Sequence, residues 1–322
     1  MFSLAENALR VEAIDLWIDS MRARERCYVS HGHSDHAREH GVVVATPGTA
    51  GLCRVRFRRR VEFEERAYNE PWDERDHRLT LFSAGHVLGS SQLLVEGERG
   101  RFVYTGDFSL APSFTAEPAE VKRCDVVLME CTFGRPHYVF PPRDEVAEEI
   151  ARFARLALET DAVPVFFAYS LGKAQEAMAI LGSAGIPIAV HSAVAAISDA
   201  YVRCGVALPE YQRYDAASFR GNHALIWPPS ARALPRSFGR RRARTAVLTG
   251  WALDASAHYR YGADRAFPLS DHADYPGLLA YVERAQPRKV LLFHGRRDFV
   301  HRLRRLGVDA EYLENHAQLS LF

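Results

Sequence analysis

Short apolar runs separated by turns dominate the first 130 residues of the chain. The runs that have the length and apolar content of β-strands are 11–18, 26–30, 78–83, 91–95, 101–105 and 125–129. Polar residues follow several of these runs immediately. In a layered sheet protein, residues at strand ends gather along one edge, where functional sites are usually built. We therefore expect a sheet-rich region with its functional residues at the strand ends.

The pattern changes near Pro141. Apolar residues in 143–158 recur at helical spacing, and a second helix is predicted from Leu171. The short apolar runs that predict strands in this part are 163–168, 186–190, 223–227 and 246–248. Alternating strands and helices are typical of a doubly wound α/β unit. After Phe267 come the polar segment 270–274, a helix and the strand 290–293.

Composition places the chain among ordinary globular proteins. Hydrophobic residues make up 48% and charged residues 25% of the 322 residues. No stretch approaches the ~18 apolar residues that a membrane span needs, and no signal peptide is recognisable. The five cysteines are scattered and never form a C-x-x-C pair, which argues against a disulfide framework and a zinc–thiolate site. We predict a reduced, cytoplasmic enzyme without membrane attachment.

The net charge of +1 gives no global signal for nucleic acid. Two local clusters of arginine stand out, and each fits either a solvated edge or a phosphate-binding patch. Their members are Arg54, Arg56, Arg58, Arg59 and Arg60, then Arg240, Arg241, Arg242 and Arg244.

Histidine and aspartate cluster directly after the strand at 26–30. His31, His33, Asp35 and His36 fall within six residues. Neutral imidazole and carboxylate are ligands that suit zinc, manganese and iron. Residues two apart on an extended loop can reach one ion, and the next pair can turn toward a second. The segment therefore predicts a metal site.

Three further polar residues end strands, each beside a glycine: His86, Asp107 and His294. A lone histidine after a strand is usually a polar group satisfied by its surroundings. Several such positions in one chain are harder to explain in that way, so we count all three as candidate ligands.

The series H-x-H-x-D-H, G-H-x-x-G-S, T-G-D and a strand ending in histidine resembles the ligand motifs of metallo-β-lactamase-fold hydrolases. The resemblance implies a first ion held by His31, His33 and His86. It implies a second ion held by Asp35, His36 and His294. Asp107 would bridge them, and Asp35 would also take part in catalysis. Two ions of zinc or manganese would activate a shared water and neutralise a phosphate.

Three later segments, 129–134, 167–176 and 270–274, resemble the motifs of the β-CASP module, which nucleases carry. The implied fold is a metallo-β-lactamase αββα sandwich formed by residues 1–141 and 267–322. A doubly wound α/β β-CASP domain, residues 142–266, would be inserted into it.

A phosphate-binding site is predicted where a strand meets a helix at Ser170, Gly172 and Lys173. Amides at a helix start, a hydroxyl and an ammonium group suit a phosphate. The alternative is an ordinary capped helix.

Two residues of the β-CASP-like motifs are candidates for proton transfer. His272 is the candidate general acid that protonates the departing 3′ oxygen, and Glu130 would orient it and keep it protonated. In the alternative, Glu130 is a salt-bridge partner and His272 orients a metal ligand.

The substrate expected from these motifs is nucleic acid. Histidine at position 294 is typical of β-CASP ribonucleases, whereas the motifs together look most like bacterial DNA ligase-associated exonucleases. We favour a metal-dependent DNA exonuclease that acts from a 5′ end on single-stranded DNA in repair, with DNA ligase and helicase as partners. The alternatives are an RNase J-like ribonuclease and, in another class, a thioesterase or lactonase of the same fold.

The last five residues resemble the pentapeptide that binds the bacterial sliding clamp. Leu321 and Phe322 would enter an apolar pocket, while Gln318 would bond at its rim. Alternatively Leu319, Leu321 and Phe322 form a closing edge strand, because their period of two fits that as well.

Overall fold

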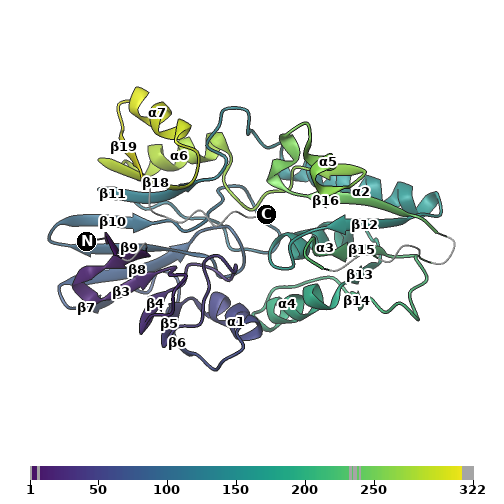
Figure 1. The fold of residues 1–322 in the computed structure, drawn as a ribbon, viewed down its shortest axis with the longest axis horizontal. Helices are drawn as coiled ribbons and strands as arrows, with labels where there is room; N and C mark the ends of the chain where they lie inside the picture. Colours follow the sequence, from purple (N-terminus) through teal and green to yellow (C-terminus); the bar gives the residue numbers. More distant parts are fainter. Residues whose placement is uncertain (1, 6–7, 232–233, 235–237, 239–240, 314–322) are drawn as a thin grey trace. The chain divides into compact units, whose positions relative to one another are not determined.

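The computed structural model describes all residues except 1, 6–7, 232–233, 235–237, 239–240 and 314–322. The chain divides into two compact units, drawn in Figure 1. The first unit contains 1–112, 116–139 and 272–322, and the second contains 113–115 and 140–271. The second unit thus begins two residues before the expected position 142 and ends five residues after 266. It also takes in Ser113–Thr115, which the sequence pattern did not indicate.

The first sheet of the first unit has six strands, in the order in which they occur along the chain. They are β1 (Phe2–Ala5), β2 (Ala8–Val11), β3 (Leu16–Ile18), β4 (Arg26–Tyr28), β5 (Val42–Ala45) and β6 (Glu62–Glu65). The single strand predicted over 11–18 is wrong. A 3₁₀ turn, η1 (Glu12–Ile14), interrupts it, and Asp15 follows with φ of 52°. The turn reverses the chain, so β2 and β3 become antiparallel neighbours.

The second sheet of this unit has seven strands. Its order is β19 (Asp309–Tyr312), β18 (Lys289–Gly295), β11 (Val126–Cys131), β10 (Gly100–Tyr104), β9 (Ser91–Gly97), β8 (His77–Ser83) and β7 (Trp72–Glu74). Strands β7 to β10 pair antiparallel, and β10, β11, β18 and β19 pair parallel. Strands β18 and β19 come from the last part of the chain, so the sheet is completed only after the second unit.

Apolar side chains of both sheets form one buried cluster between them, including Leu16 and Tyr28 from the first sheet and Leu81 and Leu128 from the second. Helix α1 (Pro47–Arg56) packs on the other face of the first sheet through Cys53. Helices α6 (Tyr275–Ala285) and α7 (Asp298–Arg305) pack on the other face of the second sheet. The unit therefore has two sheets that pack against each other, with helices on their outer faces.

The second unit has one parallel sheet of six strands. Its order is β14 (Gln212–Arg213), β13 (Ile188–Val190), β15 (Ala224–Trp227), β12 (Val163–Phe167), β16 (Ala243–Leu248) and β17 (Arg265–Phe267). The helical elements are α2 (Arg143–Glu159), α3 (Lys173–Ser183), α4 (Ser192–Arg203), η2 (Gly250–Leu253) and α5 (Ala257–Tyr261).

Cover on the two faces of this parallel sheet is uneven. Helices α2 and α3 bury apolar side chains against one face in a large cluster. The smaller cluster contains strand and loop side chains, among them Tyr214, Phe219 and Phe238. On this second face of the sheet, loop residues pack where the predicted doubly wound fold would have helices.

The chain as a whole is a mixed α/β protein with several sheets. All five cysteines are free, and Cys27, Cys53, Cys124 and Cys131 are buried. A search of the described helices found none whose length and apolar character would let it cross a membrane.

Candidate metal centre

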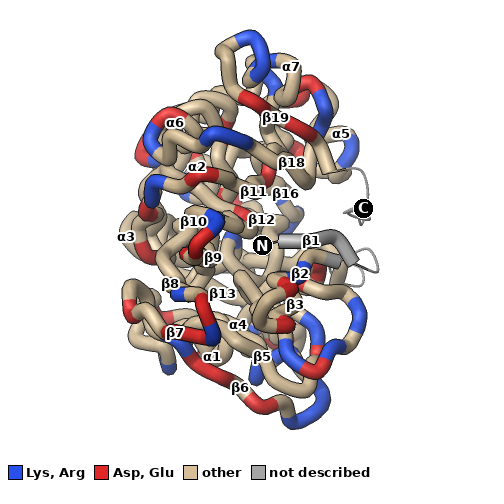
Figure 2. The backbone as a smooth tube through the Cα atoms, turned by 90° about the vertical axis from the view of Figure 1, so that its left-hand side faces the viewer, with Lys and Arg blue, Asp and Glu red and all other residues tan. Residues whose placement is uncertain are grey.

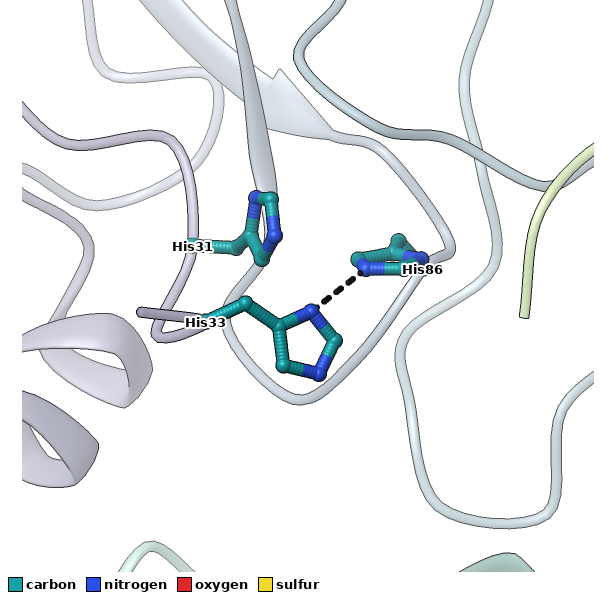
Figure 3. A group of neighbouring side chains, drawn as sticks. All are labelled: His31, His33 and His86. Atoms are coloured by element: carbon teal, nitrogen blue, oxygen red, sulfur yellow. Dashed lines mark hydrogen bonds between the residues drawn. The ribbon is translucent and has the colours of Figure 1, made fainter. Parts of the chain in front are cut away.

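Three histidines from two loops of the first unit face one another. His31 and His33 lie in the loop after β4, and His86 lies in the loop after β8. Figure 3 shows the three imidazoles turned together, with His33 Nδ1 and His86 Nε2 3.0 Å apart. One ring nitrogen from each lies within 4.8 Å of the other two. The structure thus brings together the three residues expected at the first ion.

Asp107, at the end of β10, lies at the centre of four imidazoles. Its Oδ2 atom is 3.4 Å from His36 Nε2, 3.6 Å from His31 Nε2 and 3.9 Å from His86 Nε2. Its Oδ1 atom is 3.4 Å from His294 Nδ1. A carboxylate placed in this way can contact ligands of both expected ions.

Asp35 is less closely placed than the other candidates. Among the described residues it joins none of the groups whose ligand atoms all lie within 4.8 Å of one another. Burial raises the pKa of Asp35, but the charges of His36 and His33 outweigh burial and lower it overall. The carboxylate therefore stays anionic near the histidines, and its role as a ligand stays a prediction.

Three buried polar atoms of this cluster favour the binding of a cation. Among the residues that the structure describes, His31 Nε2, His36 Nε2 and Asp107 Oδ1 are buried without a hydrogen-bond partner. An unpartnered buried polar atom costs free energy, on the order of 1–3 kcal/mol. A divalent cation would give all three a partner, and imidazole with carboxylate suits zinc or manganese. These residues therefore fit the metal that their sequence motifs imply.

The protonation of His31 and Asp107 agrees with that fit, whereas burial lowers the pKa of His36 but Asp107 and Asp19 outweigh burial and hold that pKa well above its usual range. Burial, with the nearby His36 and His86, holds the pKa of His31 well below its usual range, so this imidazole is neutral. Burial raises the pKa of Asp107, but His36 and His294 outweigh it and hold that pKa well below its usual range. Neutral imidazole and ionised carboxylate are the forms that bind metal.

Asp19, at the end of β3, holds this cluster in place and was missed in the sequence. Its carboxylate accepts hydrogen bonds from Ser30 N at 2.7 Å, Ser30 Oγ at 2.5 Å and Tyr104 Oη at 2.8 Å, and it lies 2.7 Å from His36 Nδ1. Ser30 Oγ lies 3.0 Å from His31 Nδ1. Both imidazoles are held through Nδ1, so Nε2 faces Asp107. Asp19 follows an apolar run just as Asp107 does, which is the signal that could have found it.

His294 reaches the centre through a bulge in β18. The pairing of β18 with β11 passes from Glu130 opposite Phe293 to Cys131 opposite Gly295, which leaves His294 as the extra residue. His294 has φ of 44°, a left-handed conformation that is uncommon outside glycine. Bulges re-aim side chains next to active sites, and here the bulge brings His294 Nδ1 to Asp107.

Glu130 and His272 form a pair beside the metal ligands. Glu130 is fully buried at the end of β11, and its Oε1 lies 2.9 Å from His272 Nδ1. The carboxylate also accepts from Phe108 N at 2.9 Å and Thr132 Oγ1 at 2.5 Å. The centroids of the His272 and His86 rings are 4.7 Å apart. This geometry suits the predicted general acid, and it equally suits a histidine that orients metal ligands.

Lys173 of the second unit is buried, with 6% of its surface exposed, and forms an ion pair with Asp271. Its ammonium group also lies 5.3 Å from the centre of the Tyr169 ring. The predicted phosphate ligand is therefore already paired inside its own unit, and its contact with phosphate stays a prediction.

The amides at the start of α3 have partners as well. Gly172, with φ of 87°, donates its N–H to Gln175 Oε1 at 2.9 Å. Ala174 N donates to Tyr169 O at 3.1 Å, and Ser170 O accepts from Gln175 Nε2 at 3.1 Å. The contacts of Ser170, Gly172 and Lys173 thus match the alternative of a capped helix, while phosphate binding is untested.

Part of the first arginine cluster supports the metal loop. Arg56 donates to the backbone oxygen of Gly32, between two candidate ligands, and Arg54 pairs with Glu65 at 2.5 Å. In the second cluster Arg241 pairs with Asp161 at 2.8 Å, and Arg240 lies outside the described residues. Figure 2 shows basic and acidic residues interspersed along the backbone. The terminal segment Gln318–Phe322 also lies outside the described residues.

Comparison with known proteins gives matches along nearly the whole chain. Residues 265–318 match the family model described as the Zn-dependent metallo-hydrolase RNA specificity domain. The chain is 42% identical over 320 residues to a probable DNA ligase of Opitutus terrae, covering 98% of this chain and 31% of that protein. It is 32% identical over 171 residues to the 5′ exonuclease Apollo of Gallus gallus, covering 50% of this chain and 37% of that protein.

An archaeal relative and a solved structure add to these matches. The chain is 25% identical over 187 residues to an RNase J-like protein of Methanocaldococcus jannaschii, covering 50% of this chain and 44% of that protein. It thus spans less than half of each of these three relatives. A crystal structure of a protein of unknown function from Enterococcus faecalis V583 shares the fold, with a TM-score of 0.63 and 11% identity over 92% of this chain and 80% of that one.

In its fold, its ligand cluster and its relatives the chain is similar to metal-dependent hydrolases, and nucleases are among those relatives. The family that the chain resembles is that of the β-CASP nucleases of the metallo-β-lactamase fold.

Proposed function

We propose that the chain is a DNA exonuclease that hydrolyses phosphodiester bonds with two divalent metal ions, zinc or manganese. The observation that carries this proposal is the position of Asp107, 3.4 to 3.9 Å from four imidazoles in a buried cluster. His31, His33 and His86 would hold one ion, and His36, His294 and Asp35 the other, with Asp107 between them. Two bound ions would activate a water and neutralise the charge of a phosphate in transfer. The two sheets with helices outside them support the αββα arrangement of this site.

The residues beside the ligands would handle the proton. Glu130, buried and 2.9 Å from His272 Nδ1, would orient the imidazole and favour its protonated form. His272 would then give a proton to the departing 3′ oxygen through Nε2. A positioned general acid is worth about 10²–10⁴ in rate.

DNA is the favoured polymer, and a 5′ end the favoured site of attack. Support comes from the relative named as a probable DNA ligase and from the 5′ exonuclease Apollo. Single-stranded DNA as substrate, DNA ligase and helicase as partners, and a cytoplasmic location stay predictions.

The proposal is tested with single-stranded DNA and RNA of one sequence, labelled at either end, in the presence of Mn²⁺ or Zn²⁺. We expect stepwise loss of nucleotides from the 5′ end of DNA, slower action on RNA, and no activity after chelation. Trimming from the 3′ end would contradict the polarity. Absence of cleavage of both polymers, with metal bound, would refute the nuclease activity and favour a thioesterase or lactonase activity.

A ribonuclease is the second candidate, and specific observations favour it. Residues 265–318 match a model described as an RNA specificity domain, and an RNase J-like protein is among the relatives. The same assay decides, because faster cleavage of RNA than of DNA would replace the favoured substrate.

The clamp-binding role of Gln318, Leu319, Leu321 and Phe322 is a separate proposal. Short peptides of this kind bind weakly, and a ring already on DNA raises their effective concentration. Deleting residues 318–322 should abolish binding to a bacterial sliding clamp in calorimetry and leave the melting temperature unchanged. If the melting temperature falls and the intact chain does not bind the clamp, the tail is part of the fold.

A further inference from the structure

Helix α3 of the second unit buries two charged side chains near its start, Lys173 and Glu176. Lys173 is 6% exposed and Glu176 4% exposed. Burying a charge is costly unless it is paired and hydrogen-bonded. The hydrogen-bond and ion-pair partners of these two residues therefore identify the segments that helix α3 holds in place.

Glu176 holds the segment Ser113–Thr115. Its Oε1 atom accepts from Ser113 Oγ at 2.7 Å, Phe114 N at 2.9 Å and Thr115 Oγ1 at 2.7 Å. Its Oε2 atom accepts from Arg143 Nη1 at 2.7 Å. Along the chain this segment begins six residues after Asp107, so Glu176 fixes the connection that leaves the metal centre.

Lys173 holds the other connection, the one that enters the metal centre. Its ammonium group pairs with Asp271, and Arg143 Nη2 donates to Ser270 O at 2.6 Å. The next residue after Asp271 is His272. One turn of α3, together with Arg143, therefore holds both segments of the second unit that continue along the chain into the first unit.

Inside the first unit, a backbone hydrogen bond joins the two connections. Ala273 N donates to Phe108 O at 2.7 Å. Phe108 N donates to Glu130 Oε1, the same atom that lies 2.9 Å from His272 Nδ1. Movement of either connection would therefore disturb the pair formed by Glu130 and His272.

We propose that Lys173 and Glu176 are positioning residues that hold segments 108–115 and 268–273, and through them place His272 beside Asp107. The role given to His272 rests on the proposed function. Under this proposal Lys173 acts through its ion pair with Asp271 and makes no contact with phosphate.

Hydrogen exchange of the full metal-loaded chain tests the positioning without reference to activity. We expect the amide of Phe114 to exchange at least about tenfold faster in Glu176→Gln, because it loses a charged acceptor. The amide of Ala273 should exchange faster by a similar factor in Lys173→Met, and Lys173→Arg should restore protection.

Gln175→Met is the matched control, because Gln175 is buried in the same turn and bonds to Gly172 and Ser198 instead. It should leave exchange in 108–115 and 268–273 unchanged. Equal acceleration in the control, or none in Glu176→Gln and Lys173→Met, would overturn the proposal. Glu176→Gln preserves side-chain volume, so it decides the matter if Lys173→Met does not fold.

Kinetics on single-stranded DNA separates positioning from phosphate binding. We expect Lys173→Met to lower kcat with KM little changed, and to cause no further loss when combined with His272→Ala. A raised KM that persists beside His272→Ala would mean that Lys173 binds the substrate, and the positioning role would be wrong. If the unmodified chain cleaves neither DNA nor RNA, the proposed function fails, while the exchange experiment still tests the positioning.

Discussion

Asp107 is the residue on which the two proposed metal sites depend together. Asp107→Asn keeps the size of the side chain and removes its negative charge, so both sites should weaken. We expect metal content, measured by mass spectrometry of the dialysed protein, to fall well below two ions per chain, and nuclease activity to disappear. A variant with near-normal activity would contradict the dinuclear arrangement.

Asp19 should raise the affinity for metal although it is not one of the proposed ligands. It holds His36 directly and His31 through Ser30, and outer partners of this kind are worth about 10–100-fold in metal affinity. We expect Asp19→Asn to lower zinc affinity by that factor, measured by competition with a chromogenic chelator. Arg10, on the neighbouring β2, forms an exposed pair with Asp15, so Asp15→Asn is a control that should leave zinc affinity unchanged.

His272 should separate chemistry from metal binding. We expect His272→Ala to keep its metal and to lose about 10²–10⁴ in rate. A substrate with a better leaving group than the 3′ oxygen needs less proton donation, so it should recover much of the lost rate. Loss of an ion in this variant would show that His272 is a ligand.

Among single residues, the sequence predicted many members of the candidate metal centre. His31, His33, His36 and His86, with Asp107, are close together, and each follows a strand of one of the two sheets that pack against each other. The sequence did not reveal Asp19, since its partners are 11 to 85 residues away and only the fold brings them together. The ion pair of Lys173 with Asp271 was hidden for the same reason.

Among the elements, β18 carries a strained part of the site, since His294 and Gly295 both have positive φ. A Cβ atom at Gly295, where φ is 124°, would collide with the backbone oxygen of Cys131. Gly295→Ala should therefore distort the bulge that aims His294. We expect a loss of about 1–3 kcal/mol in the free energy of unfolding, measured in denaturant, together with weaker zinc binding.

Gly262→Ala provides the comparison, because Gly262 also has positive φ of 59° but nothing lies within 4 Å of an added Cβ atom. It should cost stability through backbone strain while leaving zinc affinity unchanged. Equal zinc affinity in Gly295→Ala and the unmodified chain would mean that the bulge is not required.

The remaining elements show where patterns of apolar residues fail. The predicted helix over 143–158 and strand over 78–83 agree closely with α2 and β8, because long periodic or continuous apolar runs determine them. Helix α1 was not predicted, since its sequence PGTAGLCRVR has few large apolar residues and depends on the Thr46 cap and packing. Helix α4 was not predicted either, although Val194, Ile197 and Tyr201 recur in it at helical spacing.

At the scale of the molecule, every candidate ligand belongs to the first unit, so metal should stabilise that unit selectively. A ligand present at about 100 times its Kd stabilises the folded state by about 2.7 kcal/mol. Calorimetry should therefore show one transition that moves to lower temperature on chelation and one that does not. Asp107→Asn is the control and should show a much smaller shift. Identical shifts of both transitions would argue against two separate cooperative units.

The order of the strands also has a consequence for synthesis on the ribosome. Strand β11 pairs on one side with β10, and its other neighbour, β18, is translated about 160 residues later. During that interval the second unit can fold, while β11 presents an open edge of the kind that favours aggregation. His294 arrives with the strand that closes this edge. A nascent chain thus completes the proposed ligand set only when its sheet is closed, which would keep unfinished chains from attacking nucleic acid.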